Sequence, residues 1–547
     1  MALIQVAQTF LGANTQKNPK TNLPEGVGVD ARNMDTTHSD LRGLLAADVS
    51  HTLTGVGSQQ ISAYRLGRNT VSDTQYWLTR SVDADFVRSL IAEDTTERTY
   101  TTDGTKPKYT DNTLLGGSEP YPASWVDTGV PYPDTDMTAT ETTPGTGTEE
   151  IRVYLDTFLR ANGDESAPNP TTTTITVNPN SVVTLNSFDP VPSGSHGITK
   201  RRIYCSTDGG EFQRIAEITS GTASHVDDLT RGAVLQTGGS TSKPAWLVPP
   251  DNMKGLISLW NNMMGGFVDK SYRICEAGYP HAWPIEYEGV LADTIIGSAK
   301  FGTTWVLCTS GVPYIVTGST PGGMRDQPVY FDRGGCVSKR SVAGVGHGVC
   351  WASNRGLCYF GQNGPRVLTE DFIDEATWQA LTPSSIIGTR WRQYYIGFYY
   401  NGTDRKGFMI DTVNPAGVIW LDQGAYGTFY DTLTDSLHLL QARNAGPSTQ
   451  PIRKWASGSA LNVTFKTEKT RANHETNPSV AMVVATTYPV TYKLYADGSL
   501  KHTQTVTSRD PFRLPGGYVA RDFQQEVSGG TGPIEAIVLA EEMVDLP

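Results

Sequence analysis

The chain has 547 residues, a mass of 59.3 kDa and a formal net charge of −12. That length exceeds what one compact core organises, so two to four domains are expected. The acidic balance argues against a protein that grips nucleic acid through clustered Lys and Arg side chains, although it suits a smooth conduit whose wall repels phosphate. Abundant Gly, Pro and Thr with only 18% charged residues favour strands and turns, so the predicted fold class is mostly β.

Export and membrane insertion are not expected. The first sixteen residues lack a basic start and a long apolar run, and no later window reaches the roughly 18 apolar residues of a membrane span. The cysteines contain no C-x-x-C pair, which argues against zinc-ribbon and thioredoxin sites and favours buried reduced thiols. An alternative is that Cys350 and Cys358 face each other across a hairpin. The six cysteines are Cys205, Cys275, Cys308, Cys336, Cys350 and Cys358.

The first 132 residues are interpreted as an N-terminal arm followed by the first propeller strands. The sequence up to about Asp48 is polar and turn-rich, with few apolar positions to bury, and resembles an adaptor-contacting arm. Short alternating segments follow between His51 and Tyr109. Residues 133–148, "PDTDMTATETTPGTGT", are predicted to be a Thr-rich linker because almost nothing in them offsets the entropy of ordering.

Residues 149–244 carry the pattern of a β-sandwich, with short strands and turn signals over about a hundred residues. The segment "ITKRRIYCSTDGGEFQRIAEI" is its predicted central hairpin, turning at Asp208, Gly209 and Gly210. We interpret this region as a domain that resembles fibronectin type III.

Residues 245–453 repeat a strand–turn–strand pattern at a spacing of about 40 to 50 residues, which predicts β-propeller blades. The expected turns include Ser310-Gly311, Asn354-Arg355-Gly356 and Asn401-Gly402. One helix is predicted within "TEDFIDEATWQAL", with Thr369 as its cap. Residues 454–547 again read as strands and are predicted to form a C-terminal β domain that closes the propeller.

The segment "SYRICEAGYPHAWPIEYEG" raises the question of a catalytic pair, because it holds His281 and Glu276. Two glycines, two prolines and several aromatic residues surround them, so a rigid structural corner is favoured over an active-site loop. "STDGGEF", Ser206 to Phe212, matches one sialidase-type Asp box, but it lies in the sandwich hairpin, outside the predicted propeller, where a turn is the simpler reading.

Other motifs give no stronger indication of chemistry. "GVGHG", Gly344 to Gly348, is interpreted as a blade turn, because a strand and not a helix follows it. The acidic pair Asp83 and Asp85 lacks further ligands at metal spacing. The sequence therefore predicts a protein that is not an enzyme and has no catalytic, cofactor-binding or metal-binding residues.

Several longer segments together resemble the tail nozzle, or tail tubular B, proteins of short-tailed bacteriophages. They are "LISLWNNMMGGFVDKSYRICEAGYPHAWPIEY", "TTWVLCTSGVPYIVTGSTPGGM", "GGCVSKRSV", "EDFIDEATWQALTPSSI" and the ending "FRLPGGYVARDFQQEVSGGTGPIEAIVLAEEMVDL". The start, "GANTQKNPKTNLPEGVGVDARNMDTTHSDLRGL", is similar to the start of those proteins. The resemblance covers most of the chain after Asp251, with the fibronectin-like domain as an insertion.

The resemblance implies a virion protein, assembled in the cytoplasm of a host bacterium, that forms a tail ring of six copies. Its implied partners are the adaptor or portal-proximal ring and the tail fibres or spikes, with genomic DNA passing through without tight binding and with no membrane span. The alternative is a host-recognition protein, either a glycan-binding tailspike or adhesin or a sialidase-like propeller. The aromatic residues and the Asp-box-like hairpin favour that alternative.

Overall fold

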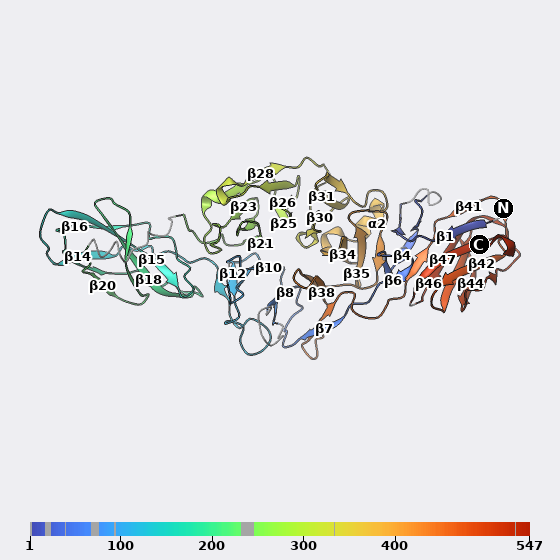
Figure 1. The fold of residues 1–547 in the computed structure, drawn as a ribbon, viewed down its shortest axis with the longest axis horizontal. Helices are drawn as coiled ribbons and strands as arrows, with labels where there is room; N and C mark the ends of the chain where they lie inside the picture. The colour runs from blue at the N-terminus through green and yellow to red at the C-terminus, as the bar shows by residue number, and fades with distance from the viewer. Residues whose placement is uncertain are drawn as a thin grey trace.

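The protein is an elongated, almost entirely β molecule with three modules in line (Figure 1). The computed structural model describes residues 3–16, 23–38, 40–66, 76–91, 94–230, 245–332, 334–530 and 532–546. A β-sandwich lies at one end, a ring of small sheets in the middle, and a second β module at the other end, where both termini meet. The predicted class, mostly β with a propeller-like core, a fibronectin type III-like sandwich and a C-terminal β region, is confirmed.

The central module is a β-propeller-like ring. Within the described residues, seven sheets follow one another, and the first strand of each lies against the first strand of the next. Strand β37 then returns to β8, so the ring closes. The sheets are β8 (Ser62–Leu66) with β9 (Tyr76–Arg80); β10 (Asp85–Arg88), β11 (Thr99–Thr102), β12 (Lys108–Thr110) and β13 (Val126–Asp127); β21 (Lys254–Ser258), β22 (Met264–Val268), β23 (Ser271–Ile274) and β24 (Glu288–Val290); β25 (Ile295–Phe301), β26 (Thr304–Thr309), β27 (Tyr314–Thr317) and β28 (Arg325–Pro328); β29 (Ala343–Gly344), β30 (Gly348–Ser353), β31 (Gly356–Gly361) and β32 (Gly364–Val367); β33 (Ile387–Trp391), β34 (Tyr394–Tyr400), β35 (Arg405–Asp411) and β36 (Ile419–Leu421); and β37 (Gly427–Asp431), β38 (Ser436–Leu440) and β39 (Gln450–Lys454) with β7 (Asp48–Leu53).

The last sheet is completed by the early strand β7, which pairs antiparallel with β39. The prediction that residues 454–547 close the propeller is therefore wrong. Besides strands within 245–453, the ring contains strands before residue 132, the region in which the first propeller strands are predicted. The physical reason is that closure needs a strand able to add to the open edge of the last sheet, and β7 supplies it from the start of the chain.

The sandwich packs two sheets face to face around a core that includes Tyr154 and Ile203. The hairpin predicted at Asp208–Gly210 is present, with Asp208 and Gly209 both at positive φ. The predicted linker at 133–148 is not confirmed, because residues 138–143 form the first strand of the sandwich. Its strands are β14 (Thr138–Thr143), β17 (Val182–Asn186) and β20 (Ser224–Asp227) in one sheet, and β16 (Thr173–Val177), β15 (Glu150–Arg160), β18 (Ile198–Thr207) and β19 (Gln213–Thr219) in the other.

Strand β14 places only Ala139 against the sandwich core, and it forms because its backbone hydrogen-bonds along β17. Its Thr and Glu side chains stay largely exposed. Thr favours extended backbone, so an edge strand can be polar on both faces. A prediction based on the number of apolar residues therefore misses this strand.

The C-terminal module contains the start of the chain as well as its end. Strand β1 pairs with β47, and β4 lies between β36 of the ring and β40 of the module. The module's strands are β1 (Leu3–Ala7), β4 (Asp30–Arg32), β40 (Thr464–Lys466), β41 (Thr470–Thr476), β42 (Val480–Ala485), β43 (Val490–Ala496), β44 (Ser499–Val506), β45 (Phe512–Arg513), β46 (Ala520–Ser528) and β47 (Ile534–Ala540). Two short pairs, β2 (Gly12–Ala13) with β3 (Val27–Gly28) and β5 (Met34–Asp35) with β6 (Arg42–Gly43), complete the N-terminal segment.

The prediction that residues before Asp48 form an arm with little to bury is wrong for the described part of that segment. Its scattered apolar side chains are buried in the largest hydrophobic core, together with residues of the ring and of the C-terminal module. They lack a strand or helix period because each fills a separate gap between the two modules. The buried residues are Phe10, Ala13, Ala31, Met34, Leu41, Leu44 and Ala47.

One helix, α2 (Glu375–Ala380), lies where the sequence predicts one, but it begins later than expected. Asp374 is its cap and accepts a hydrogen bond from the Thr377 amide at 3.0 Å. Thr369, the expected cap, instead accepts a hydrogen bond from the Leu357 amide at 3.1 Å. No helix in the described residues has the length and apolar character needed to cross a bilayer.

A glycine recurs at or near the start of five inner strands, every 39 to 47 residues, and it lets neighbouring blades approach at the ring axis. A Cβ at Gly388 would lie 2.4 Å from the Ser341 carbonyl oxygen, and one at Gly427 would lie 2.1 Å from the Ile61 carbonyl oxygen. Both distances are shorter than any ordinary contact, and both partners are backbone. The five glycines are Gly255, Gly297, Gly344, Gly388 and Gly427.

We therefore expect Gly388→Ala to lower the free energy of unfolding by about 1–3 kcal/mol, because overpacking against backbone forces a shift of the strands. The denaturant midpoint measures this. Gly57→Ala is the control, since its added methyl meets nothing within 4 Å. Equal midpoints for the two variants would contradict the close approach.

Candidate site at the sandwich junction and the ring axis

His281 is buried at the junction between the sandwich and the ring, with 5% of its surface exposed. Its Nε2 lies 3.1 Å from the Glu165 carbonyl oxygen, and its Nδ1 lies 3.4 Å from an Asp164 carboxylate oxygen. Glu276, its candidate partner, instead accepts a hydrogen bond from the Tyr287 hydroxyl at 3.1 Å. The structure thus separates the two, and the corner contacts the sandwich instead of forming a catalytic pair with Glu276.

Asp164 is the centre of this junction. Its carboxylate accepts hydrogen bonds from Arg98 at 3.2 Å and from Arg160 at 3.4 Å, besides its contact with His281. Arg98 precedes β11, Arg160 ends β15, and His281 lies between β23 and β24. One buried carboxylate therefore joins two sheets of the ring to the sandwich.

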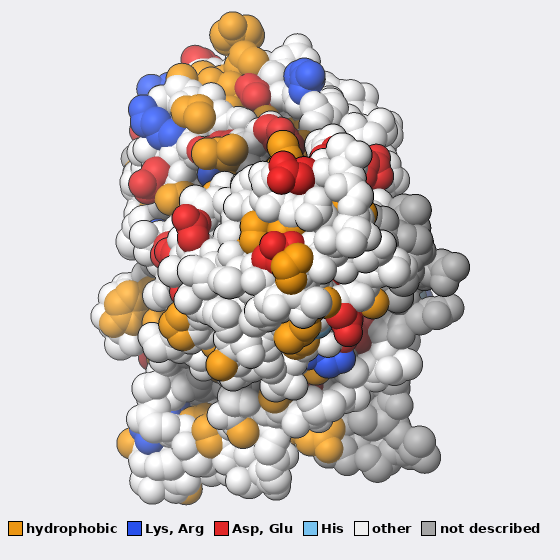
Figure 2. Space-filling view, turned by 90° about the vertical axis from the view of Figure 1, so that its left-hand side faces the viewer, with side chains coloured by type: hydrophobic (Ala, Val, Ile, Leu, Met, Phe, Trp, Pro, Cys, Tyr) orange, Lys and Arg blue, Asp and Glu red, His pale blue; other side chains and the backbone are white. Residues whose placement is uncertain are grey.

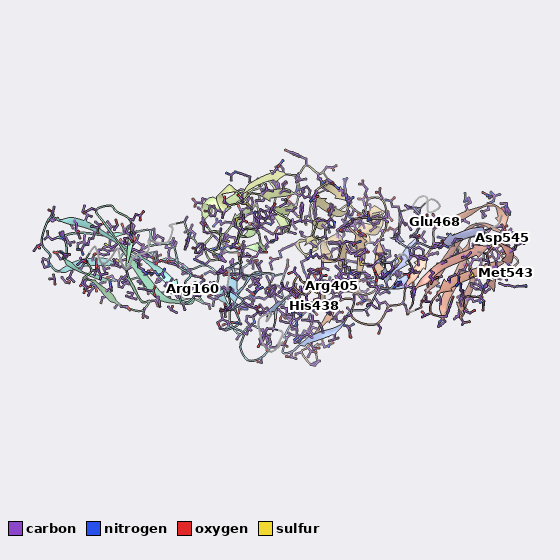
Figure 3. All side chains as sticks on the ribbon, viewed as in Figure 1. Arg160, Arg405, His438, Glu468, Met543 and Asp545 are labelled. Atoms are coloured by element: carbon purple, nitrogen blue, oxygen red, sulfur yellow. The ribbon has the colours of Figure 1, made fainter. Side chains whose placement is uncertain are left out.

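Arg160 fixes the chain segment that leads from the ring into the sandwich, and Figure 3 places it at the boundary of the two modules. It is 2% exposed and donates hydrogen bonds to four backbone carbonyl oxygens. Three of these belong to Asp127, Thr128 and Gly129 at the end of the ring sheet, and the fourth belongs to His196 in the sandwich. Each would be a buried unpaired acceptor without the guanidinium.

The charges at the junction shift the pKa values of its acids and bases. Burial raises the pKa of Asp164, but His281, Arg98 and Arg160 outweigh burial and hold that pKa below its usual value. Burial lowers the pKa of His281; Asp164 opposes this effect, and Arg160 and Arg98 add to it. The junction therefore favours an ionised Asp164 and a neutral His281.

The remaining sequence candidates have structural contacts. The Asp208 carboxylate of the Asp-box-like hairpin accepts a hydrogen bond from the Ile151 amide at 2.8 Å, which ties the turn to β15. "GVGHG" forms the β29–β30 turn, with Gly346 at positive φ. In the described part of the chain, no group of three or more His, Cys, Asp or Glu side chains could hold a metal ion.

All six cysteines are free and buried, as the sequence predicts. The alternative pairing of Cys350 with Cys358 is wrong. Across the β30–β31 hairpin Cys350 pairs with Tyr359, and Cys358 pairs with Trp351. The two thiols belong to different hydrophobic clusters, so they cannot meet.

The ring axis is closed at its narrow end by a lysine and an arginine. Lys339 Nζ lies 3.0 Å from Asp83 and 2.8 Å from Asp85, which explains the isolated acidic pair. Arg340 donates to the carbonyl oxygens of Ile61 at 2.8 Å and Tyr426 at 2.7 Å. These contacts span the starts of three inner strands and hold the narrow end together.

At the other end the axis widens into a cavity of about 560 Å³, which we call the axial cavity. Inner strands β8, β10, β21 and β37 form its walls, and it shares Ala63 and Ala84 with the narrow end. Polar and apolar groups contribute about equally to its lining, which includes Tyr64, Phe86, Arg88, Ser258, Phe429, Tyr430 and Thr432.

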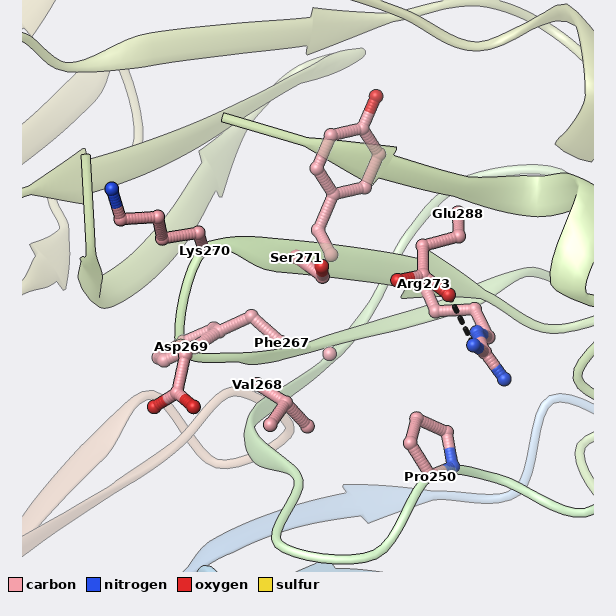
Figure 4. A pocket seen from close by; sticks show the side chains of 10 residues that line it. Pro250, Phe267, Val268, Asp269, Lys270, Ser271, Arg273 and Glu288 are labelled. Carbon is pink, nitrogen blue, oxygen red and sulfur yellow. Dashed lines mark hydrogen bonds and ion pairs between the residues drawn. The ribbon is translucent and has the colours of Figure 1, made fainter. Parts of the chain in front are cut away.

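A second cavity of about 440 Å³ lies beside the β22–β23 hairpin (Figure 4). Its cations are already engaged: Arg273 pairs with Glu288, and Lys270 donates to the Ala292 carbonyl oxygen at 2.7 Å. Neither cation is therefore available to bind a charged ligand in this second cavity.

The sequence did not reveal the junction residues or the axial cavity. Arg98, Asp164 and Arg160 are separated from His281 by more than a hundred residues, and no spacing rule relates them. The inner-strand glycines were the one available signal, since their recurrence marks where blades meet at the axis.

No family model and no curated protein matches the chain. Among solved structures, the chain is similar to the protein described as BBS1N in complex with ARL6DN, at 8% identity and a TM-score of 0.31, covering 76% of this chain and 98% of that one. It is also similar to AztD from Citrobacter koseri, at 12% identity and a TM-score of 0.25, covering 70% and 99%. An extracellular domain of BT4673 from B. thetaiotaomicron has a TM-score of 0.21 at 8% identity, covering 78% and 43%. Scores this low carry no argument about fold or function.

Arg160→Met should loosen the sandwich from the ring, because it leaves Asp164 short of a cation and four carbonyls unpaired. Breaking a buried ionic network in this way costs about 3–5 kcal/mol. Limited proteolysis should then cleave near residues 129–135 faster than in the wild type. Lys200→Met, on the exposed face of the same sandwich, is the control, and equal protection of the two variants would count against the junction.

Acidification should also weaken the junction. A pKa of His281 held below its ordinary value near 6.5 contributes stability above that pH and loses it as the pH falls. The lowered pKa of Asp164 acts in the same direction further into the acid range. We expect the thermal midpoint to fall between pH 7 and pH 5, and His281→Gln to flatten that fall. Burial also lowers the pKa values of His438 and His225, so part of the fall should remain in His281→Gln. Exposed His474→Gln should leave the slope unchanged; a slope in His281→Gln as steep as in the wild type would refute the assignment.

Proposed function

We propose that this chain is a structural virion protein that forms a ring of the tail nozzle in a short-tailed bacteriophage. The observation that carries the proposal is the joining of three β modules into one elongated subunit through buried contacts at both junctions. Such a subunit can transmit load along its length and present different faces at its two ends. A tail ring needs both properties.

The resemblance to tail nozzle proteins supports the same proposal. The segments that carry it fall on the blades from β21 onward, on the Lys339–Arg340 segment at the axis, and on the last strands of the C-terminal module. The sandwich is inserted between β13 and β21, outside these segments. A module that projects from one end of the subunit is suited to contact a fibre or spike, while the other end meets the adaptor or portal-proximal ring.

The conduit in this proposal runs between subunits. The axis within each subunit is closed by Lys339 and Arg340, so DNA does not pass through it. Six copies carry a formal charge of six times −12, or −72. On the sandwich end of the molecule, shown in Figure 2, Lys and Arg side chains lie in separate small groups among Asp and Glu. A conduit wall with the acidic balance of the whole chain would let a duplex slide, since few phosphate contacts would form.

The purified chain should assemble into a ring of six times 59.3 kDa, about 356 kDa, and that ring should not bind duplex DNA at physiological salt. Mass photometry and a filter-binding assay measure the two properties. Imaging of virions with symmetry analysis should place the chain below the portal.

A chain found only as a monomer, located elsewhere in the virion, or bound tightly to duplex DNA would overturn the proposal. Arg160→Met again offers a comparison, because loosening the sandwich should impair attachment of fibres while the rest of the subunit still forms the ring.

A further inference from the structure

Three surface turns contain an asparagine followed by glycine, and they differ in how the atoms of that pair are held. The three pairs are Asn162-Gly163, Asn363-Gly364 and Asn401-Gly402. From this difference we propose that Asn401 is a site of spontaneous deamidation, at which the side-chain amide becomes an aspartyl or isoaspartyl carboxylate. The inference goes beyond the proposed function, since it uses only the chemistry of one turn in one subunit.

Deamidation needs water as its only second reactant. The backbone nitrogen of the following residue attacks the side-chain carbon Cγ, a C–N bond forms, and the amide nitrogen leaves as ammonia with the proton of the attacking N–H. Water then opens the cyclic imide at either carbonyl, which gives aspartate or isoaspartate. Glycine in the second position places no Cβ beside the attacking nitrogen. A favourable site therefore needs a free glycine N–H, an activated side-chain carbonyl and access to water.

The attacking nitrogen is free at Gly402 and held at the other two sites. Gly163 N–H donates to the Arg160 carbonyl oxygen at 3.1 Å. Gly364 is paired with Gly361 in the β31–β32 ladder. Gly402 lies in the loop between β34 and β35, outside their ladder, and its N–H has no hydrogen-bond acceptor among the described residues. Only this glycine nitrogen is therefore available to attack without first breaking a backbone contact.

The side-chain carbonyl of Asn401 is activated by the turn itself. Its Oδ1 accepts hydrogen bonds from the Thr403 amide at 3.0 Å and from the Asp404 amide at 2.7 Å. Two N–H donors on this oxygen stabilise the negative charge that develops there when Cγ is attacked. The same bonds fold the side chain back over the following peptide, as in an Asx turn, and so bring Cγ toward the Gly402 nitrogen. Residues 401–404 are all exposed, so water reaches the imide.

The other two asparagines lack this combination. Asn162 Oδ1 accepts one hydrogen bond, from the Asp164 amide at 3.0 Å. Its Nδ2 donates to the Asp164 carboxylate at 3.0 Å, so the leaving nitrogen is held by the junction network. The Asn363 side chain has no hydrogen-bond partner among the described residues, so nothing polarises its carbonyl or fixes its orientation. We therefore expect both to react more slowly than Asn401.

Deamidation would alter the contacts of the β34–β35 turn. The Gly402 carbonyl oxygen accepts a hydrogen bond from the Tyr400 hydroxyl at 2.8 Å. Isoaspartate at position 401 lengthens the main chain between these two residues by one carbon, so this bond must shift or break. The product also adds a negative charge next to Asp404.

The test follows the three asparagines in the full chain during incubation at mildly alkaline pH. Peptide mapping by mass spectrometry with electron-transfer fragmentation distinguishes asparagine, aspartate and isoaspartate at each position. We expect Asn401 to react roughly tenfold faster than Asn162 or Asn363, the scale of one stabilising interaction in a transition state. Gly402→Ala should slow the reaction, because its methyl shields the attacking nitrogen. Gly57→Ala is the matched control, since neither added methyl meets another atom within 4 Å, and it should leave the rate unchanged.

Incubation in concentrated urea separates the effect of the fold from that of the sequence. The unfolded chain should deamidate the three positions at similar rates, because all share the same Asn-Gly pair. An unmodified Asn401 in the folded chain, a rate there no higher than at Asn162 or Asn363, or a ranking that persists in urea would each overturn the inference. None of these results bears on whether the chain forms a tail ring, which its mass and position in the virion decide.

Discussion

The pairing of β7 with β39 is the interaction on which the central module depends. Residues 48–53 form the outer strand of a sheet whose other strands lie between residues 427 and 454, so the ring closes only when nearly the whole chain is present. Without β7, the edge of β39 would be exposed and Leu53 would leave the cluster that it forms with Leu440 and Ile452. An open sheet edge at this position would invite pairing between molecules. The pairing of β7 with β39 therefore stabilises the ring and also protects the molecule against aggregation.

The N-terminal segment has a second role, because it reaches β7 only after passing through the C-terminal module. Strand β1 extends one sheet of that module, and β4 joins its other sheet to β36 of the ring. Phe10 and Met34 are buried in the core that both modules share. The two ends of the chain are therefore folded as one unit, and the C-terminal module is fixed to the ring by strand β4 and by the shared core as well as by the chain connection after β39. The domain boundary predicted at residue 454 therefore follows the sequence pattern but does not separate two independent units of the fold.

The parts of this architecture that follow local rules were predictable, and the parts that depend on distant pairing were not. Tight turns such as Asn401-Gly402 and the sandwich hairpin at Asp208–Gly210 have local signatures, and the blades repeat. Strand β14 was missed because an edge strand gains its stability from backbone hydrogen bonds. Strands β1 and β4 were missed because β47 and β40, with which they pair, lie more than four hundred residues away. His281 lies in a buried corner, but its partner Asp164 belongs to an inserted domain that no spacing in the sequence connects to it. Polar clusters assembled across domains leave little trace in a single sequence.

Charge has the same structural use at both ends of the ring module. At the sandwich junction and at the narrow end of the axis, every buried cation named here meets a carboxylate or a carbonyl, so the charges hold modules in a fixed orientation. At the wide end Arg88 lies 3.9 Å from the Glu97 carboxylate, and Lys300 Nζ lies 3.4 Å from both the Ser258 hydroxyl and the Leu259 carbonyl oxygen. A cation without such a partner would be costly to keep away from water. Structural use of charge therefore explains all three regions.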